Sequence, residues 1–379
     1  MNFYLKILIL VVLLSFLSVK IVNNEKQVIL SISRGLFPCV FLCCMAGARS
    51  LNVGKDNYSY SRIFLEMTYE KVHLFNLDFC WVYNLWDFVI RKFTDNVYVF
   101  NLCCAIVIYL SLYLFIHRYS TDERVSIFLF ITLGIFFNSM NQTRQALSTA
   151  ILLFGFKYAV DRKLIKAMFF CFVATFIHNV AIVMIPIYAF ICLVPKVSSS
   201  VVMIFSGSSL AVALLYNRLM WAFVHVFPKY KHYLKYSKLF VERRSIYRYA
   251  DFFMSLMLQV LFVCGIYLTR KKALENKTAN RDEEDTDNFG NILACMNSVN
   301  LCMTYLILNG DIFNRLKSLF FYWVLLVIPY LIRKYFNDNV ALKILVCTIS
   351  IVYMWRLGVH DGDGVIPYQF FFKWEEILK

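Results

Sequence analysis

The stretch "NSMNQTRQALSTAILLFGF", residues 138–156, changes from polar to apolar within a few positions. Its second half is apolar enough to begin a membrane-embedded helix. Its first half places Arg144 next to Gln145 at the mouth of that helix. An ionised side chain near a membrane span is costly, so it normally has a charged partner or reaches the lipid headgroups. The stretch therefore predicts a helical membrane protein, and it raises the question of what neutralises Arg144.

The composition of the whole chain agrees with this prediction. Of its 379 residues, 60% are hydrophobic, 18% aromatic and 17% charged, and the mean hydropathy is +0.62. Soluble domains are about 45–50% apolar and about 25% charged. We therefore predict an all-α integral membrane protein that crosses the bilayer several times.

The net charge of +15 indicates an anionic partner of some kind. In a soluble protein this charge would suggest nucleic acid, but in a membrane protein it is typical of basic cytoplasmic loops. We expect the lipid bilayer and an anionic substrate as partners, and no nucleic acid. The 12 cysteines mostly lie in apolar runs without zinc-site spacing, so we interpret them as core residues. We expect no cofactor and no metal ion.

Apolar runs predict about twelve transmembrane helices in a single polytopic domain, residues 1–379. The runs are 3–19, 28–46, 97–116, 125–139, 146–160, 164–177, 180–194, 199–216, 251–269, 289–308, 318–332 and 341–356. The runs at 164–194 could instead form one long kinked helix. Two long loops are predicted, 47–96 and a basic loop at 217–250. The amphipathic stretch "FCWVYNLWDFVIRKF" in the first loop predicts a helix on the membrane surface.

Alternate loops form two sets, and the charge rule does not by itself decide which set is cytoplasmic. The two long loops decide the balance of Lys and Arg between the sets. We assign the short, basic loops to the cytoplasm. The opposite face then gathers the unusual polar residues of the chain. They are Arg49, Asp56, Arg144, Gln145, His178, Arg243, Arg244, Arg248, Asp311 and Arg315.

Each of these residues also has a plainer interpretation. Arg49 and Arg144 could anchor the chain at the lipid interface. His178 could be a structural histidine, and Arg315 could simply pair with Asp311. The basic, aromatic loop could lie on anionic lipid. Their occurrence on one predicted face favours a shared ligand, because several guanidinium forks around one cavity suit a diphosphate, while nearby aromatic rings suit sugars.

The same residues carry a resemblance to a known family. An early pattern is formed by Arg49, Val53, Gly54, Asp56 and Tyr60. A central pattern is formed by Asn141, Arg144, Gln145, Leu147, Phe176, His178, Asn179, Ala181, Pro186 and Tyr188. Arg315 and the terminal Ile366, Pro367 and Tyr368 complete it. In this order and spacing the chain resembles the EpsG/Wzy family of polysaccharide polymerases, with Lys55 as a modest departure.

The resemblance implies a GT-C-like glycosyltransferase of the bacterial inner membrane, with both long loops and the active site facing the periplasm. Such an O-antigen or exopolysaccharide polymerase joins oligosaccharide repeat units carried on undecaprenyl diphosphate, and a chain-length regulator could be a partner. A flippase or exporter of the same lipid-linked glycan, an O-antigen ligase and a membrane acyltransferase are the alternatives.

Within this reading, the arginines are candidates for diphosphate binding. They are Arg49, Arg144 and Arg315, supported by Arg243, Arg244 and Arg248, with Gln145 and Asp311 as further contacts. His178 is the first candidate for the general base, because imidazole titrates near neutrality, and Asp56 is the second. We interpret "DGDG" at 361–364 as a turn, so we expect a metal-independent reaction.

Overall fold

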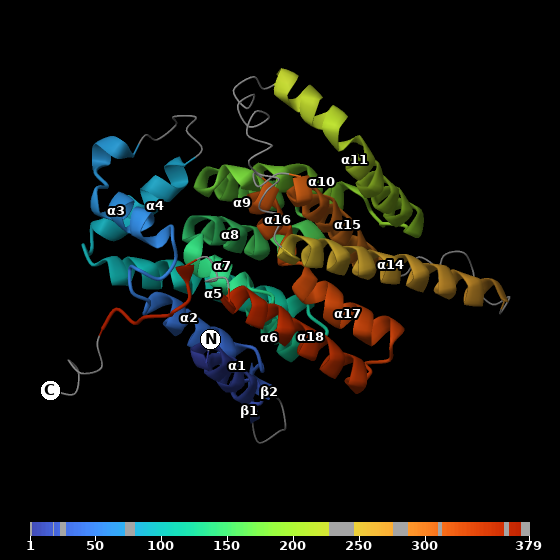
Figure 1. Cartoon of the computed structure of the whole chain (residues 1–379), viewed down its shortest axis with the longest axis horizontal. Coiled ribbons are helices and arrows are strands. Elements are labelled where there is room, and N and C mark those ends of the chain that lie inside the picture. The colour runs from blue at the N-terminus through green and yellow to red at the C-terminus, as the bar shows by residue number, and fades with distance from the viewer. Residues whose placement is uncertain are drawn as a thin grey trace. The chain divides into compact units, whose positions relative to one another are not determined.

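The computed structural model is almost entirely helical (Figure 1). It describes residues 2–17, 19–22, 28–72, 80–226, 246–275, 287–309, 313–359 and 364–372. They belong to two compact units, which we describe separately. The first unit comprises Met1–Leu193 and Val340–Lys379, and the second comprises Val194–Asn339.

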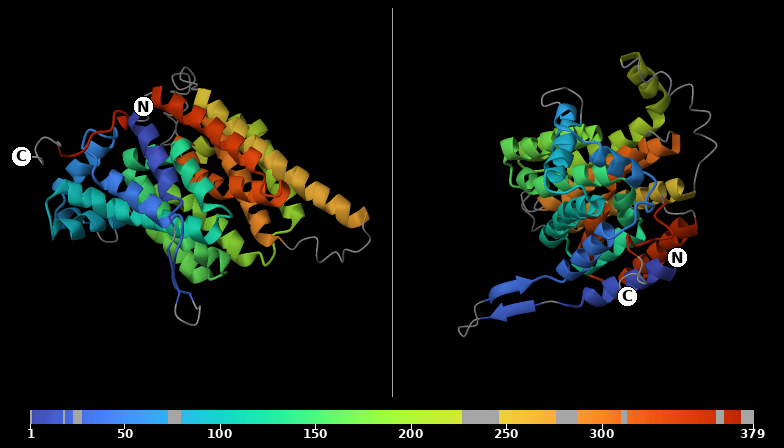
Figure 2. Two further views of the ribbon diagram at one scale, coloured as in Figure 1. Left: turned by 90° about the horizontal axis from the view of Figure 1, so that it is seen from below. Right: turned by 90° about the vertical axis from the view of Figure 1, so that its left-hand side faces the viewer.

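The first unit opens with helix α1 (Asn2–Leu14) and an antiparallel hairpin of strands β1 (Val19–Val22) and β2 (Val28–Ile32), which extends away from the helices (Figure 2). The prediction of one helix over 28–46 is therefore wrong for its first part. Both strands are rich in valine and isoleucine, which favour strands, and hydropathy alone does not separate a strand from a helix.

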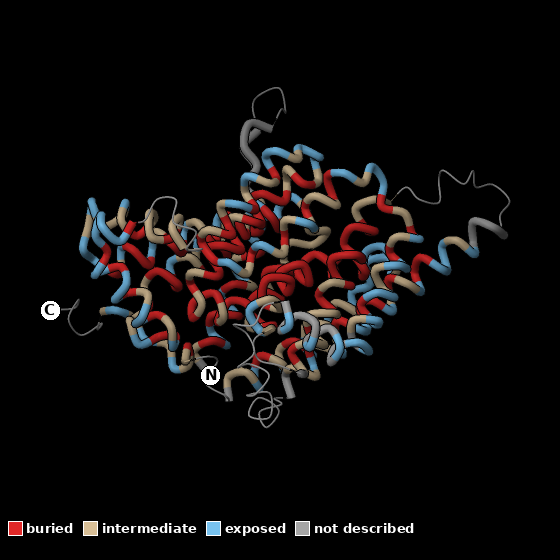
Figure 3. The backbone as a smooth tube through the Cα atoms, turned by 90° about the horizontal axis from the view of Figure 1, so that it is seen from above, coloured by how far each residue is buried: buried red, intermediate tan, exposed pale blue. Residues whose placement is uncertain are grey.

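Helices make up the rest of the first unit. They are α2 (Leu36–Gly47), α3 (Asn57–Leu65), η1 (Tyr69–Lys71), α4 (Trp81–Arg91), α5 (Val97–Tyr119), α6 (Glu123–Thr132), α7 (Ile135–Asn141), α8 (Thr143–Val160), α9 (Leu164–Ile177), η2 (Asn179–Val183), α10 (Met184–Leu193) and α18 (Val340–Val359). Helix α8 packs against α5, α9 and α10. Buried residues line the inward sides of the helices, and exposed residues lie outside (Figure 3).

Helices α2 and α5 run antiparallel and define the two ends of the first unit. A Cβ on Gly47, at the end of α2, would meet Leu102 near the start of α5. Gly35, just before α2, lies instead against Tyr113 in the second half of α5 and against Glu123. The end of α2 and the start of α5 are thus neighbours, and so are the start of α2 and the end of α5.

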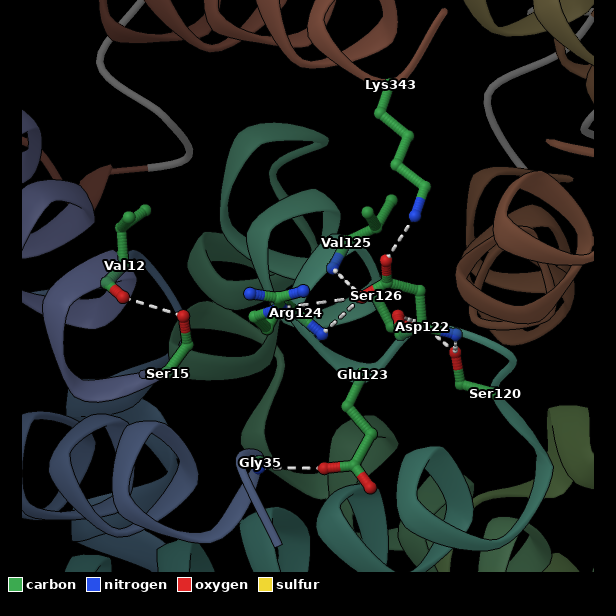
Figure 4. Close-up of polar contacts among 10 residues, drawn as sticks. All are labelled: Val12, Ser15, Gly35, Ser120, Asp122, Glu123, Arg124, Val125, Ser126 and Lys343. Atoms are coloured by element: carbon green, nitrogen blue, oxygen red, sulfur yellow. Dashed lines mark hydrogen bonds and ion pairs between the residues drawn. The ribbon is translucent and has the colours of Figure 1, made fainter. Parts of the chain in front are cut away.

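One of these ends is held together by charged side chains, and we call it the ion-pair end (Arg118, Asp122, Glu123 and Lys343). Figure 4 shows the last three of these residues. Asp122 caps α6 by accepting hydrogen bonds from the backbone N–H groups of residues 124 and 125, and Lys343 Nζ donates to its Oδ2 at 2.8 Å. Glu123 Oε2 accepts from the Gly35 N–H at 2.8 Å. These contacts tie α2, α6 and α18 together.

The second unit surrounds helix α15. Its helices are α11 (Ser199–Val226), α14 (Ile246–Glu275), α15 (Asn288–Asn309), α16 (Asn314–Phe321) and α17 (Val324–Tyr335). Helix α15 packs against the other four. Buried amides join it to α14: Asn297 Nδ2 donates to Gln259 Oε1 at 2.9 Å, and Asn300 Nδ2 donates to Ser255 Oγ at 2.9 Å. Lys317 pairs with Asp251 at 2.5 Å.

The chain is a multi-pass membrane protein by the length and composition of its helices. Within the described residues, 4 helices are long and apolar enough to cross a bilayer, or up to 6 if each of two bent helix pairs forms one span. One such pair, α6 and α7, bends by 58° at Gly134, whose φ of 77° is readily adopted by glycine. Other apolar helices are shorter, so twelve spans and a GT-C-like arrangement stay predictions.

The two predicted long loops contain more helix than the sequence indicated. The loop at 47–96 holds α3, η1 and α4, and the predicted helix within "FCWVYNLWDFVIRKF" is confirmed as α4. Residues 217–226 and 246–250 of the other loop belong to α11 and α14. The remainder of that loop, with Arg243 and Arg244, lies outside the described residues, as does Asp311.

Candidate functional site

The polar stretch that precedes α8 forms the junction between two helices. Helix α7 ends at Asn141 and α8 begins at Thr143, with Gln142 between them at φ −97° and ψ 56°. Asn141, Thr143 and Gln145 are buried, and Arg144 is half-buried. We call this end of the first unit, opposite the ion-pair end, the arginine end (Arg49, Asp87, Arg144 and His178).

Arg49 is at the centre of a buried hydrogen-bond network. Its Nη2 donates to Thr143 Oγ1 at 2.9 Å, to Asn57 Oδ1 at 3.2 Å and to Asn101 Oδ1 at 3.4 Å, and Nη1 donates to the Ala46 carbonyl. The side chain is 2% exposed. The fork therefore joins α2, α3, α5 and α8, and protein groups occupy the positions that a diphosphate would take.

The early motif folds back onto the α7–α8 junction. The backbone N–H of Asp56 donates to Asn141 Oδ1 at 3.0 Å. Gly54 has a φ of 92°, and a Cβ there would lie 3.0 Å from the Asn141 Cα. The Gly54 N–H donates to the Gly364 carbonyl at 2.9 Å, which adds the C-terminal segment to the same site. The early, central and terminal parts of the family pattern thus meet at the arginine end.

Arg144 reaches from the first turn of α8 across to two other helices. Its Nε donates to the Ile177 carbonyl at 2.8 Å, and Nη2 donates to Cys80 Sγ. Its guanidinium carbon lies 5.3 Å from the ring centroid of Tyr83. Among the described residues Nη1 donates to no acceptor, and no carboxylate forms an ion pair with Arg144. One terminal nitrogen of Arg144 is therefore left unused by the described residues, whereas both terminal nitrogens of Arg49 donate to protein groups.

His178 directly follows the residue whose carbonyl binds Arg144. It ends α9 and caps η2, where its Nδ1 accepts a hydrogen bond from the Val180 N–H at 3.4 Å. The residue is 6% exposed. The break at His178 replaces the alternative of one continuous kinked helix over 164–194. The capping contact gives His178 a structural role, while its position keeps it beside the candidate anion-binding group.

Asp87 is a member of the site that the sequence analysis missed. It lies on α4, one turn after Tyr83, and it is 0% exposed. Neither carboxylate oxygen has a hydrogen-bond partner among the described residues. Burial raises the pKa of Asp87 to about 8, and nearby Arg144 opposes the rise. The sequence did contain a signal for Asp87. It is an isolated acid that follows Tyr83 by four residues and so lies on the same face of the helix.

Not all of the predicted site residues are brought together. Arg49, Asp56, Arg144, Gln145 and His178 all lie in the first unit. Arg248 and Arg315 belong to the second unit, where Arg248 Nη1 donates to the Ile307 carbonyl at 3.3 Å and Arg315 is exposed. A shared site for all the arginines stays a prediction.

The described residues contain no group of three or more histidine, cysteine, aspartate or glutamate side chains placed to hold a metal ion. All 12 cysteines are free thiols. The chemistry available at the arginine end is therefore that of a guanidinium, an imidazole, buried carboxamides and a buried carboxyl group.

The sequence model of the EpsG family matches residues 35–370. No curated protein and no solved structure matches the chain.

Proposed function

Because this chain belongs to the EpsG family, which includes Wzy-type polymerases, we propose that it is a polysaccharide polymerase. It would join oligosaccharide repeat units carried on undecaprenyl diphosphate, at the periplasmic face of a bacterial inner membrane. The observation that carries the proposal is the half-buried guanidinium of Arg144, which lies where the separate parts of the family pattern meet and keeps a donor for an anionic ligand.

The reaction would be a glycosyl transfer. A hydroxyl group of the incoming unit attacks the anomeric carbon of the growing chain, and the bond from that carbon to the diphosphate oxygen breaks. Negative charge then accumulates on the leaving diphosphate. A preorganised guanidinium at that point lowers the barrier, because it is already in place when the charge develops. Arg144 is the group we assign to this role.

His178 is assigned as the general base: its Nδ1, which accepts from the Val180 N–H at 3.4 Å, would exchange that contact for the proton of the attacking hydroxyl. Its backbone is joined to that of Ile177, whose carbonyl holds Arg144 Nε at 2.8 Å, so the two groups are fixed relative to each other. Asp56 is the second candidate. The reaction needs no metal ion in this scheme, because the diphosphate is a good leaving group once its charge is matched.

The remaining predicted residues take supporting roles. Arg49 acts as a positioning residue, because its guanidinium is buried and donates to groups on α2, α3, α5 and α8. Gln145 supports the same junction. We assign the arginines and Asp311 of the second unit to the glycan and diphosphate of the substrates. They are Arg243, Arg244, Arg248 and Arg315.

The test measures glycan chain length in cells that lack the native protein and carry wild type or a variant at equal membrane abundance. We expect a full ladder with wild type, single repeats with Arg144→Ala and a shortened ladder with Arg144→Lys, which keeps the charge but loses the bidentate fork. Arg118→Ala is the matched control, because Arg118 lies at the ion-pair end beside Asp161.

Other results would overturn the assignment. A full ladder from Arg144→Ala would remove Arg144 from the site. A wild-type protein that restored glycan export, or attached finished glycan to an acceptor without building the ladder, would replace the polymerase with a flippase or a ligase.

A further inference from the structure

The starting observation is that Asp87 and Arg144 share one buried region without bonding to each other. Asp87 is 0% exposed, and within the described residues neither of its oxygens accepts a hydrogen bond. The Arg144 guanidinium carbon lies 5.3 Å from the centroid of the Tyr83 ring, one turn before Asp87 on α4, while the Arg144 Nε and Nη2 donate elsewhere. A buried carboxylate without a hydrogen bond is unstable unless a charge compensates it or a proton neutralises it.

The groups around Asp87 leave Arg144 as its cationic partner. On its own helix, Tyr83 lies one turn earlier, and burial raises the pKa of the Tyr83 phenol well above its usual range, so that it stays neutral. Cys104 of α5 is also close to Asp87, and its Sγ accepts a hydrogen bond from Trp86 Nε1 at 3.4 Å.

Two more distant groups, Tyr60 and Arg49, affect Tyr83 and Cys104. Tyr60 of α3 lies against Tyr83, with ring centroids 6.3 Å apart. Arg49 acts electrostatically on Cys104, but its fork is used by other protein groups. Neither Tyr60 nor Arg49 bonds to the Asp87 carboxyl group. The state of that carboxyl group is therefore governed by Arg144 and by protonation.

We propose that Asp87, in its ionised form, is an internal counter-ion of Arg144, and that an anionic diphosphate ligand takes the place of this carboxylate while Asp87 accepts a proton. The step balances: one proton passes from water to the carboxylate as the ligand anion pairs with the guanidinium, and it returns to water when the ligand leaves. The inference rests on the proposed function, because it takes a lipid diphosphate as the ligand. Asp87 is a positioning residue that acts through Arg144.

The Asp87 carboxylate and the ligand anion compete for one cation, the Arg144 guanidinium. While Asp87 is ionised, its charge attracts Arg144 and reduces the attraction of Arg144 for another anion. When Asp87 is protonated, the guanidinium is free to bind the ligand. Because burial raises the pKa of Asp87 to about 8, the change between these states falls within an accessible pH range.

The experiment uses the full-length protein in lipid nanodiscs and a short-chain prenyl-diphosphate hexose as the probe. Each phosphorus of this probe has one ester and one anhydride bond and therefore a single, strongly acidic oxygen, so the charge of the probe is constant between pH 6 and 9. The dissociation constant is measured across this range for wild type, Asp87→Asn and Asp87→Glu. The control is Asp95→Asn, because Asp95 is an exposed acid just beyond the same helix and pairs with Arg91.

We expect wild-type binding to weaken about tenfold from pH 7 to pH 9, as the fraction with Asp87 protonated falls. Asp87→Asn should bind equally well at both values, Asp87→Glu should restore a pH dependence, and Asp95→Asn should follow wild type. Calorimetry in buffers of different ionisation enthalpy should show close to one proton taken up per ligand bound by wild type at pH 9. That measurement stands even if Asp87→Asn does not fold.

The outcomes separate the two proposals. Wild-type binding that is independent of pH, or that takes up no proton at pH 9, would overturn the counter-ion role while leaving the polymerase proposal in place. The same conclusion follows if Asp87→Asn keeps the wild-type pH dependence. Absence of probe binding by wild type, together with absence of a glycan ladder in cells, would overturn both.

Discussion

The two ends of the first unit handle charge in opposite ways. At the ion-pair end, Asp122 and Glu123 each bind backbone N–H groups, and Asp122 also binds Lys343 at 2.8 Å. At the arginine end, Arg49 is surrounded by amides and a hydroxyl, and Asp87 has no hydrogen-bond partner among the described residues. Helix α5, with 23 residues, separates these ends by about 34 Å.

The difference separates the charges that stabilise the fold from the charges that are left available for a ligand. Paired and capped carboxylates mainly support the fold, since each of them completes contacts between helices. An incompletely paired cation close to an unbonded buried acid is unfavourable for folding alone. Such an arrangement is typical of binding and catalytic sites, where a ligand completes the charge balance.

The largest effect on stability is expected when the buried Arg49 guanidinium is removed from the arginine end. Arg49→Ala leaves buried acceptors on Asn57, Asn101 and Thr143 without their donor, so we expect a loss of about 3–5 kcal/mol in stability. Thermal unfolding in detergent measures it, with Arg62→Ala as the control on an exposed arginine. An unchanged melting temperature for Arg49→Ala would show that these contacts do not hold the arginine end together.

Asp87→Asn, unlike Arg49→Ala, should increase the stability of the protein, and the size of the increase should depend on pH. The folded protein holds the Asp87 proton up to about pH 8, while the unfolded chain releases it near 3.8, so wild-type stability falls between these values. The neutral amide avoids that loss, and we expect a gain of about 2 kcal/mol at pH 8 that shrinks toward pH 5. Melting temperatures of both proteins at the two pH values test this, and parallel curves would contradict it.

Gly54→Ala should have a smaller effect, confined to the loop of the early motif. A φ of 92° and a distance of 3.0 Å from a new Cβ to the Asn141 Cα leave little space for a side chain. We expect a loss of about 1.5 kcal/mol together with weaker binding of the diphosphate probe. Gly207→Ala is the matched control, because a Cβ there would meet nothing within 4 Å. Equal effects of the two substitutions would refute the argument from backbone conformation.

The smallest effect is expected at the ion-pair end. Asp122→Ala removes the cap of α6 and the partner of Lys343, which should reduce stability by about 1 kcal/mol and leave the glycan ladder unchanged at equal abundance. The ladder and the melting temperature are measured on the same variant. Loss of the ladder without loss of protein would place a functional site at this end as well.

The sequence predicted the helical membrane class and the position of most helices, because apolar runs and polar interruptions are local features. It could not distinguish β2 from a helix, since both are apolar runs. It also grouped Arg49 with Arg144, although both terminal nitrogens of Arg49 donate to protein groups and only one terminal nitrogen of Arg144 does. That distinction depends on Asn57, Asn101 and Thr143, which are far apart in the sequence and meet only in the fold.

Asp87 was overlooked for a similar reason. The sequence placed it on a helix at the membrane surface, where an acid would face water. In the fold, α4 packs on α9, with the Trp81 and Phe176 rings 5.4 Å apart, and turns Tyr83 and Asp87 inward. The buried side of an amphipathic helix is determined by the element that packs against it. The local sequence of the helix does not predict that element.

The hairpin of β1 and β2 limits how deeply the first unit can sit in a bilayer. The outer edge of each strand carries backbone groups that hydrocarbon cannot satisfy, so the hairpin belongs in water or among headgroups. The flanking helices α1 and α2, of 13 and 12 residues, are only about 18–20 Å long, against about 30 Å for an average hydrocarbon core. Wherever they cross, either the membrane thins around them or residues beyond the helix ends reach its surfaces, and local thinning shortens the path of a polar lipid headgroup between the two surfaces.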